Sequence, residues 1–375
     1  MRQKLLELCN IQYGFAFDSS GFTEDSSFLP IVRIRDVKRG YSETYYTSEY
    51  PEEYVIHSGD LLVGMDGEFN IARWKSRDAL LNQRVCKISA KKGTDEEYLR
   101  FVLSKALKEI ENRTAFVTVK HLSAKALNKL ELDVPSLSEQ KRISNTLASI
   151  EYIVELRNNE LKKLDDLIKA RFVEMFGNET NPYNWPMINV EDVANVSVGV
   201  VIKPAQYYTD AEHGVKAFRS LNIGPMSIKD GDWVYFSHEG NDKNAKSQLR
   251  ENDLLIVRSG APGTACVVPK QYEGCNAIDI IIARPNTEKI NPYYLCTFTN
   301  MPHGKRQIDE GTGGAAQQHF NVGKYNKLQL LLPPLELQNE FVAFITQVDK
   351  SKAAVQKSLD ETQILFDSLM QEYFG

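Results

Sequence analysis

The sequence lacks any hydrophobic run long enough to cross a membrane, and its first residues lack the uninterrupted apolar core of a signal peptide. We therefore expect a cytoplasmic protein. Cysteine is also scarce: five occur in 375 residues, with no Cys-x-x-Cys pair, which argues against a disulfide framework and against a zinc knuckle. We expect reduced, mostly buried thiols at Cys9, Cys86, Cys266, Cys275 and Cys296.

Motifs for catalysis and for nucleotide binding are missing as well. No Gly-x-x-x-x-Gly-Lys-Ser/Thr phosphate loop occurs, and the six histidines lack the spacing of metal ligands. A base-methylating tetrapeptide needs a polar residue before a double proline and an aromatic residue after it, whereas Pro333-Pro334 lies between two leucines. The glycine-rich run at 311–314 could let a backbone approach phosphates, but a flexible loop is the simpler interpretation. The sequence thus predicts no catalytic site, no metal and no cofactor on this chain.

An excess of positive charge is absent too. The net charge is −5, which argues against a simple nucleic-acid binder but does not exclude one, because binding depends on where the charges lie. Three basic clusters occur in the first third of the chain: Arg33, Arg35, Lys38 and Arg39; Arg73, Lys75 and Arg77; and Arg84, Lys87, Lys91 and Lys92. Either these clusters contact a polyanion, or they form a solvated face with interspersed acids such as Asp36 and Asp78.

What the sequence does contain is an internal duplication. Residues 134–177 return in register from residue 332 to residue 375. The matches include Pro135 with Pro333, Gln140 with Gln338, His121 with His319 and Phe176 with Phe374. Further upstream, Asp60 matches Asp253, and the pair Arg33 with Asp36 matches the pair Arg219 with Asn222. The chain is therefore two copies of one unit.

Each copy ends in a segment with the apolar spacing of a long helix. Steps of four and three residues alternate in both segments, which is the pattern of a heptad seam. The first seam is Ile143, Leu147, Ile150, Val154, Leu161, Leu164, Ile168 and Met175, with Arg157 and Arg171 as polar breaks. The second is Phe341, Ile345, Val348, Lys352, Val355, Leu359, Thr362, Phe366, Leu369 and Tyr373. Because the second globular part is inserted between the two helices, we expect them to run antiparallel as a coiled coil with a pseudo-two-fold axis.

The globular parts carry short strand signals and one longer helical signal each. Strands are predicted at 29–35, 60–65, 85–88, 215–221, 253–258 and 277–284, and helices around 96–112 and 292–303. The prediction is an α+β fold in four parts: a globular domain at 1–134, a helix at 135–177, a second globular domain at 178–332 and a second helix at 333–375.

Short motifs keep the same order in both copies. They are the Gly59-Asp60-Leu61-Leu62 element, His121-Leu122 and His319-Phe320, and a Pro-x-Leu-x-x-Gln entry to each helix at Pro135 and Pro333. In this order, and over essentially the whole chain, the sequence resembles the DNA specificity subunit of type I restriction-modification systems. The resemblance implies two target-recognition domains, each reading one half of a split double-stranded DNA sequence, with no active site on this subunit.

The resemblance also implies partners. The two helices would set the spacer between the half-sites and dock two methyltransferase subunits, and restriction subunits would join the complex. S-adenosylmethionine and ATP would then bind only to those partner subunits, and this chain would carry no cofactor.

Candidate DNA-binding residues follow from the chemistry of base recognition, since arginine, asparagine and glutamine pair with guanine and adenine edges. They are Arg33, Arg35, Arg73, Lys75, Asn82, Gln83, Arg84 and Lys120 in the first domain, and Arg219, Asn222, Arg258, Gln317, Gln318 and His319 in the second. Positions that recur in both copies serve either the scaffold or phosphate contacts, because domains that read different sequences should differ at their base readers. Asn82-Gln83-Arg84 aligns with Asn276-Ala277-Ile278, so polar readout there is not shared.

Two other classes of protein stay open. One is a structural adaptor whose coiled coil joins two protein-binding domains, and it would show no salt-sensitive affinity for DNA. The other is an enzyme with a dispersed site, which is disfavoured because no catalytic constellation recurs in both copies.

Overall fold

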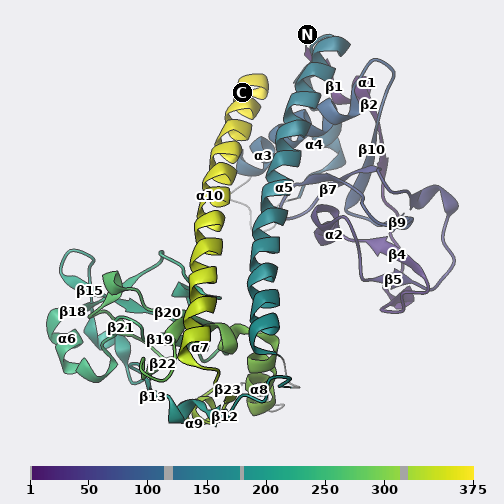
Figure 1. The fold of residues 1–375 in the computed structure, drawn as a ribbon. Helices are drawn as coiled ribbons and strands as arrows, with labels where there is room; N and C mark the ends of the chain where they lie inside the picture. The colour runs from purple at the N-terminus through teal and green to yellow at the C-terminus, as the bar shows by residue number, and fades with distance from the viewer. Residues whose placement is uncertain (1, 114–120, 178–180, 313–319) are drawn as a thin grey trace. The chain divides into compact units, whose positions relative to one another are not determined.

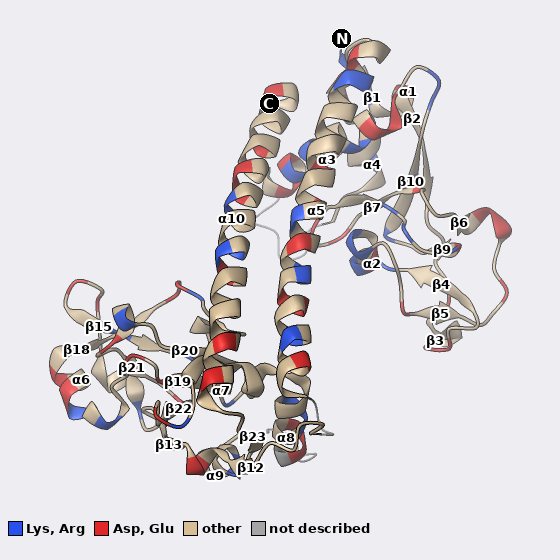
Figure 2. Cartoon of the chain, viewed as in Figure 1, with Lys and Arg blue, Asp and Glu red and all other residues tan. Residues whose placement is uncertain are grey.

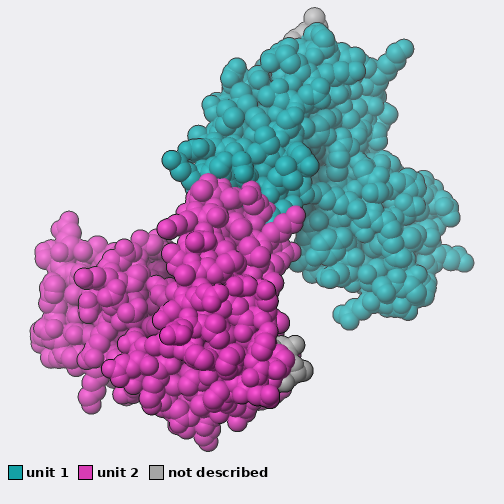
Figure 3. Space-filling model, in the orientation of Figure 1, with its two compact units in different colours: residues 1–159, 356–375 teal, residues 160–355 magenta. Residues whose placement is uncertain are grey.

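The structure is a computed structural model that describes residues 2–113, 121–177, 181–312 and 320–375 (Figure 1). The chain divides into two compact units, coloured in Figure 3: unit 1 comprises residues 1–159 and 356–375, and unit 2 comprises residues 160–355. Each unit holds one globular part and one half of each long helix, α5 (Leu137–Phe176) and α10 (Leu335–Phe374). No helix among the described residues has a stretch that is both long and apolar enough to span a membrane.

The globular part of unit 1 is a set of small sheets with short helices. Its strands are β1 Arg2–Lys4, β2 Cys9–Tyr13, β3 Phe22–Thr23, β4 Leu29–Val32, β5 Tyr45–Tyr46, β6 Val55–Ile56, β7 Leu61–Gly64, β8 Ile71–Arg73, β9 Ala79–Leu81, β10 Val85–Ala90 and β11 Glu131–Asp133. Its helices are α1 Leu5–Leu8, α2 Ile34–Arg39, α3 Glu96–Arg113 and α4 Ala124–Asn128. β1 pairs with β11, an antiparallel sheet has the order β2-β10-β7-β8, and a mixed sheet has the order β3-β5-β4-β9-β6.

The globular part of unit 2 repeats this plan. Its strands are β12 Met187–Asn189, β13 Ala194–Val198, β14 Tyr208–Thr209, β15 Gly214–Phe218, β16 Ile223–Gly224, β17 Ser227–Ile228, β18 Val234–Ser237, β19 Leu254–Val257, β20 Ala265–Val267, β21 Asn276–Ala277, β22 Ile280–Pro285 and β23 Gln329–Leu331. Its helices are α6 His238–Lys243, α7 Pro292–Asn300, α8 Pro302–Thr312 and α9 Val322–Asn326. The sheets have the orders β12-β23, β13-β22-β19-β20, β14-β18-β15-β21 and β16-β17.

The mixture of helices and strands agrees with the α+β prediction, and the differences lie at element ends. The predicted strand at 29–35 stops at Val32, because the buried Asp36 carboxylate accepts a hydrogen bond of 3.0 Å from the Arg33 backbone N–H and starts α2. The predicted strand at 277–284 is broken at Asp279, whose φ is +51°. The predicted helix at 292–303 ends at Asn300, and Pro302, which lacks a backbone N–H, begins α8.

The long helices pack against the globular core of each unit. In unit 1, Ile143 and Leu147 of α5 are buried with α3 and the β2-β10-β7-β8 sheet, and the guanidinium of Arg142 lies 5.6 Å from the Tyr373 ring of α10. In unit 2, the Phe172 and Phe341 rings lie 5.5 Å apart. In each unit the N-terminal half of one long helix thus packs beside the C-terminal half of the other, as an antiparallel pair requires, and the apolar seams face the core.

The recurrent helix-entry motif has a structural explanation. In unit 1 the Gln140 side chain accepts a hydrogen bond of 2.8 Å from the Asp95 backbone N–H and donates one of 3.0 Å to the Pro135 carbonyl. In unit 2 the Gln338 side chain accepts one of 2.8 Å from the Asn291 N–H and donates one of 2.8 Å to the Pro333 carbonyl. Gln140 is 2% exposed and Gln338 is 0% exposed. Each buried amide thus ties the start of a long helix to the start of the short helix α3 or α7.

All five cysteines are buried free thiols, as the sequence predicted. Burial raises the pKa of the Cys86 and Cys266 thiols to about 12, and that of Cys9 and Cys275 to about 11. A raised pKa keeps a thiol protonated and unreactive at neutral pH. The described residues also include no group of three or more His, Cys, Asp or Glu that could hold a metal ion.

Candidate nucleic-acid interface

In unit 1, three loops meet where strand β7 ends and strand β10 begins. The Met65 backbone N–H donates a hydrogen bond of 2.8 Å to the Arg84 carbonyl, and the Leu122 N–H donates one of 2.7 Å to the Met65 carbonyl. Asp66 and His121 form an isolated β-bridge next to these bonds. We call these residues, Met65, Asp66, Gln83, Arg84 and His121, the strand-end site of unit 1.

The carboxylate of this site lies inside and its arginine lies outside. The Asp66 carboxylate contacts Arg84 Nη1 at 2.7 Å and His121 Nδ1 at 2.5 Å. The Arg84 side chain is 52% exposed, whereas that of Asp66 is 19% exposed. Asp66 therefore holds Arg84 in place while about half of the Arg84 side chain stays exposed, which suits a residue that pairs with a guanine edge or a phosphate.

An aromatic side chain borders this site. The Phe15 backbone N–H donates to the Leu81 carbonyl at 2.9 Å, and the Gln83 N–H donates to the Phe15 carbonyl at 2.7 Å. The Phe15 ring is partly exposed and lies 5.1 Å from each of the Phe17 and Tyr54 rings. Asn82, by contrast, is buried, and its side-chain carbonyl accepts the Gln83 N–H at 2.9 Å. Of the predicted Asn82-Gln83-Arg84 triplet, Gln83 and Arg84 face solvent, and Asn82 shapes the turn.

Strand pairing identifies the equivalent site in unit 2. Val85 lies opposite Gly64 in unit 1, and Ile280 lies opposite Val257 in unit 2. The residues next to these pairs are therefore equivalent: Asp279 stands where unit 1 has Arg84, and Arg258 stands where unit 1 has Met65. The strand-end site of unit 2 is formed by Arg258, Asp279 and the neighbouring loop at 199–203.

This register corrects the sequence alignment at the site. The parallel bridges Phe15 with Asn82 and Val200 with Ile278 make Asn82 equivalent to Ile278, two residues away from the predicted match with Asn276. Unit 1 then has the two residues Gln83 and Arg84 where unit 2 has only Asp279. The strands on either side of this turn pair alike in the two units although the turns differ in length by one residue.

The ion pair at the two sites is reversed. In unit 2, Arg258 Nη1 contacts the Asp279 carboxylate, and Arg258 Nε donates a hydrogen bond of 3.1 Å to the Phe320 carbonyl. The cation thus comes from the end of β19 and the acid from the start of β22, opposite to the order in unit 1. The Arg258 side chain is 16% exposed, so this predicted DNA-binding residue is mostly engaged inside the unit.

Two positions that recur between the copies, Asp36 and Asn222, belong to the scaffold. Asp36 and Asn222 are both fully or almost fully buried, and each side chain caps the backbone N–H of the arginine three residues earlier, at 3.0 and 2.9 Å. Asn222, which is 0% exposed, also donates a hydrogen bond of 2.7 Å to the Gly231 carbonyl. Contrary to the prediction, Asn222 is a capping residue with no surface to offer to DNA. Arg219 donates to the Asp232 carbonyl.

Arg73 is likewise occupied within its unit. Its guanidinium contacts the Glu96 and Glu97 carboxylates at 3.0 and 2.7 Å and the Gly59 carbonyl at 2.9 Å, which links β8 to α3. These three partners satisfy most of its hydrogen-bonding capacity, so Arg73 stabilises the unit and has little left for a base.

Exposed cations gather around the short helix α2, which is blue over much of its length in Figure 2. We call this the α2 basic cluster; its members, all exposed, are Arg33, Arg35, Lys38, Arg39 and Lys75. Lys75 joins the helix through a backbone hydrogen bond of 3.0 Å to the Gly40 carbonyl. Partner acids are few: Lys38 contacts Glu68 at 3.3 Å and Arg35 contacts Asp36 at 3.7 Å. Such a cluster suits phosphate contacts better than base readout.

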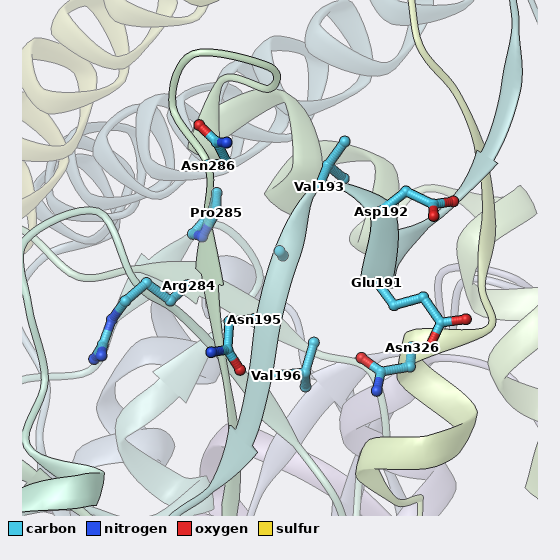
Figure 4. Close-up of a pocket in the computed structure, with 10 residues that line it drawn as sticks. Glu191, Asp192, Val193, Asn195, Val196, Arg284, Pro285, Asn286 and Asn326 are labelled. Atoms are coloured by element: carbon cyan, nitrogen blue, oxygen red, sulfur yellow. The ribbon is translucent and has the colours of Figure 1, made fainter.

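A polar cavity of about 480 Å³ opens in unit 2 beside Glu191, Asp192 and Asn326 (Figure 4). The buried side-chain carbonyl of Asn326 has no hydrogen-bond partner there, whereas its counterpart Asn128 accepts one of 2.8 Å from the Tyr13 hydroxyl. Val198 occupies the position equivalent to Tyr13, which explains the missing partner. Two carboxylates lie on its wall, and the arginine there, Arg284, pairs with Asp253 at 2.7 Å, so this cavity does not suit a phosphate.

Four predicted DNA-binding residues, Lys120, Gln317, Gln318 and His319, lie outside the described residues, as does part of the glycine-rich run. Sequence reasoning missed Asp66, Asp279 and the loop at 199–203. The alignment could have found Asp279 only with the correct one-residue shift. Acidic residues and apolar loops match no DNA-binding motif, so the sequence contains no other signal that would have identified them.

Comparisons with known proteins agree with these two related units. A family model described as the type I restriction modification DNA specificity domain matches residues 2–166 and again residues 157–362. The specificity subunit of the type I restriction enzyme EcoBI from Escherichia coli is 27% identical over 99% of this chain and 84% of its own length. The StySPI specificity subunit from Salmonella potsdam is 20% identical over 92% of this chain and 80% of its own length.

Solved structures show the same fold. The type I restriction-modification S subunit from M. genitalium matches 100% of this chain and 96% of its own, with a TM-score of 0.55 and 13% identity. A chain from a study of complex assembly and conformational transition of the type I R-M system matches 100% of this chain and 97% of its own, with a TM-score of 0.56 and 17% identity.

The chain therefore belongs to the family of type I restriction-modification DNA specificity domains, with two tandem copies of that domain. It is a DNA sequence-recognition subunit of this type, and such a subunit is not itself an enzyme. Family membership favours DNA recognition over the adaptor hypothesis and over an enzyme with a dispersed site.

Proposed function

We propose that the chain recognises a bipartite double-stranded DNA target, with the globular part of unit 1 reading one half-site and that of unit 2 reading the other. The observation that carries this proposal is the pair of strand-end sites. They share strand pairing and backbone hydrogen bonds, yet they present Gln83 and Arg84 in one unit and Asp279 in the other. A common frame with different base-facing groups is what two readers of different sequences require.

Phosphate binding is assigned to other residues. We place the α2 basic cluster on the DNA backbone, because its side chains are exposed and mostly without close acids. Arg84 and Gln83 are the proposed base readers of unit 1, and Arg73, Asn82 and Asn222 are left to the scaffold. We propose that partner subunits contribute much of the remaining phosphate binding, which makes the net charge of −5 compatible with DNA recognition.

The long helices are the proposed docking surface for two methyltransferase subunits, with restriction subunits joining the complex. Both helices expose large apolar side chains on the face away from their own core: Tyr152, Ile153, Leu156, Ile364 and Leu365 in unit 1, and Leu167 and Val173 in unit 2. Several such residues close together on a helix surface are typical of protein interfaces. We further propose that the complex acts in the cytoplasm, where its DNA target lies.

Exchange of one globular domain tests the division of labour. Replacing residues 1–134 with the corresponding domain of a relative should change one half of the methylated sequence and leave the other half as it was. The reciprocal exchange of 178–332 is the matched control and should change only the second half. Sequencing the methylated bases of a host that carries the complex measures both results. A simultaneous change of both halves after either exchange would contradict the proposal.

The helices also serve as the proposed spacer. We infer that α5 and α10 pair as an antiparallel coiled coil with a pseudo-two-fold axis, supported by their antiparallel contacts within each unit. Inserting one heptad after residue 159 and one after residue 355 keeps the seam and lengthens each helix by roughly 10 Å, or about three base pairs of DNA. Methylation should move to sites with a longer spacer. Methylation that stays at the original sites would refute this role.

Cofactors are assigned to the partners. We propose that this chain alone binds neither S-adenosylmethionine nor ATP, because no phosphate loop or methyltransferase motif occurs in its sequence. Titration calorimetry of the purified chain should show no heat of binding for either ligand, with the assembled complex as the positive control. Saturable binding of either ligand to the chain alone would overturn this assignment.

A further inference from the structure

The loop that follows strand β13 in unit 2 exposes two adjacent apolar side chains. Ile202 is 79% exposed and Val201 is 49% exposed. We call these two residues the apolar tip. A single exposed apolar side chain is ordinary on a protein surface, but two adjacent β-branched ones at a loop end leave apolar surface that folding does not use.

Backbone hydrogen bonds fix the residue that precedes the apolar tip. The Val200 N–H donates a hydrogen bond of 2.8 Å to the Ala277 carbonyl, and the Asp279 N–H donates one of 3.1 Å to the Val200 carbonyl. Gly199 allows this close approach, since a Cβ on it would lie 2.3 Å from the Ala277 carbonyl oxygen. On the other side, Pro204 begins a 3-10 helix. The tip is thus a short loop presented from two fixed points, and it borders the Arg258–Asp279 ion pair.

Unit 1 treats the equivalent positions differently. The shared bridges make Ala16 and Phe17 equivalent to Val201 and Ile202. Phe17 is 5% exposed and packs against the Phe15 and Tyr46 rings at 5.1 and 5.0 Å. The exposure of the apolar tip is therefore no requirement of the common fold, and residues that differ between the two readers are where base specificity is expected.

We propose that the apolar tip reads a thymine in the half-site of unit 2 by packing against its C5 methyl group in the major groove. This inference rests on the proposed function of unit 2. The thymine methyl is the apolar group that base pairs present in that groove, and it is recognised by apolar side chains. The adjacent Asp279 carboxylate, 41% exposed on its side chain, repels phosphates but accepts hydrogen bonds from base amino groups. This combination favours a base edge over the DNA backbone.

Removal of the methyl group tests the contact directly. The complex of the full chain with its methyltransferase subunits is first used to find the methylated target. Each thymine in the half-site of unit 2 is then replaced by uracil, one position at a time, and affinity is measured for the wild type and for Ile202→Ser. One uracil should weaken wild-type binding by roughly fourfold, the factor expected for one methyl group buried at the contact. The same uracil should leave Ile202→Ser binding unchanged.

Two controls keep the result specific. Met187→Ser removes another exposed apolar side chain, on β12 in a different sheet, and should keep full sensitivity to uracil. Val201→Ser should reduce that sensitivity in part. The inference is overturned if the half-site contains no thymine, if uracil has no effect on the wild type, or if Ile202→Ser retains the wild-type sensitivity. A complex that methylates no bipartite sequence would instead contradict the proposed function itself.

Discussion

Unit 1 and unit 2 present different side chains at their strand-end sites, although the strands that form these sites pair alike. At both strand-end sites the same strands pair in the same register and an arginine meets an aspartate, but the arginine lies at the start of β10 in unit 1 and at the end of β19 in unit 2. The position that is cationic and exposed in one unit is therefore acidic in the other. Reversing an ion pair keeps the local charge balanced, so the exposed group at this site can change without loss of the frame.

The long helices give a second contrast. In unit 2, Phe341, Ile345 and Val348 of α10 are buried in the same core as Phe172 and Phe176 of α5. In unit 1, the apolar residues of α10 that face the core are only partly buried: Phe366, Leu369, Met370, Tyr373 and Phe374. The same seam is thus covered more completely in one unit than in the other, and unit 1 leaves more apolar helix surface for a partner.

The largest predicted effect tests whether the two units depend equally on the helix-entry glutamine. Gln338→Ala and Gln140→Ala each leave a backbone N–H and a carbonyl without their partner, and a buried unpaired group costs about 1–3 kcal/mol. We expect each substitution to lower the free energy of unfolding by about 2–4 kcal/mol, measured by denaturant titration. The exposed Gln363→Ala on α10 is the matched control and should change it by less than about 0.5 kcal/mol. A large loss in only one unit would show that the motif is not equivalent in both.

A smaller effect separates the base reader from the scaffold arginine. Arg84→Ala should weaken binding to the target by about 1–3 kcal/mol and relax the preference at one position in the half-site of unit 1. Arg73→Ala should instead lower stability and leave the base preference intact, because its partners are Glu96, Glu97 and the Gly59 carbonyl. Selection from a randomised DNA library measures the preference. Altered preference in Arg73→Ala but not in Arg84→Ala would reverse the assignment.

The reversed ion pair can be tested by reversing it again. Arg258→Asp places two acids together and should destabilise unit 2, and adding Asp279→Arg should recover about 1 kcal/mol by restoring a pair in the order found in unit 1. A double-mutant cycle in denaturant gives the coupling energy. Additive effects of the two substitutions would mean that the pair contributes nothing to the frame.

The smallest effect is expected at the thiols, where the units should not differ. Burial raises the pKa of Cys9 in unit 1 and of Cys275 in unit 2 to about 11, so at pH 8 only about one molecule in a thousand carries the reactive thiolate at either position. Lowering the pH reduces that fraction further, and raising the pH toward the pKa increases it. Mass spectrometry after iodoacetamide treatment should show almost no labelling of the native chain at pH 8 and five labels after unfolding. Rapid labelling of the native chain in one unit would reveal local opening there.

Sequence reasoning was most successful for features that repeat or that depend on nearby residues. The duplication, the long helices and the buried reduced cysteines could all be predicted, because apolar periodicity and repeated motifs are visible without knowing which strands pair. Gln83 and Arg84 stay predictions: their residue types suit base readout, and both side chains are exposed. The apolar tip was missed because Val200-Val201-Ile202 after a glycine equally predicts a buried strand end.

Sequence alone therefore determined the two-copy plan, the antiparallel course of the helices and the residue types available for reading bases. Tertiary structure decided which of those residues are free to do so. Arg73 is bound by acids that lie more than twenty positions away in the chain, Asn222 is buried as a cap, and Arg258 meets Asp279 only because β19 pairs with β22. Such partners are set by long-range strand pairing and packing, which residue types and local spacing do not reveal.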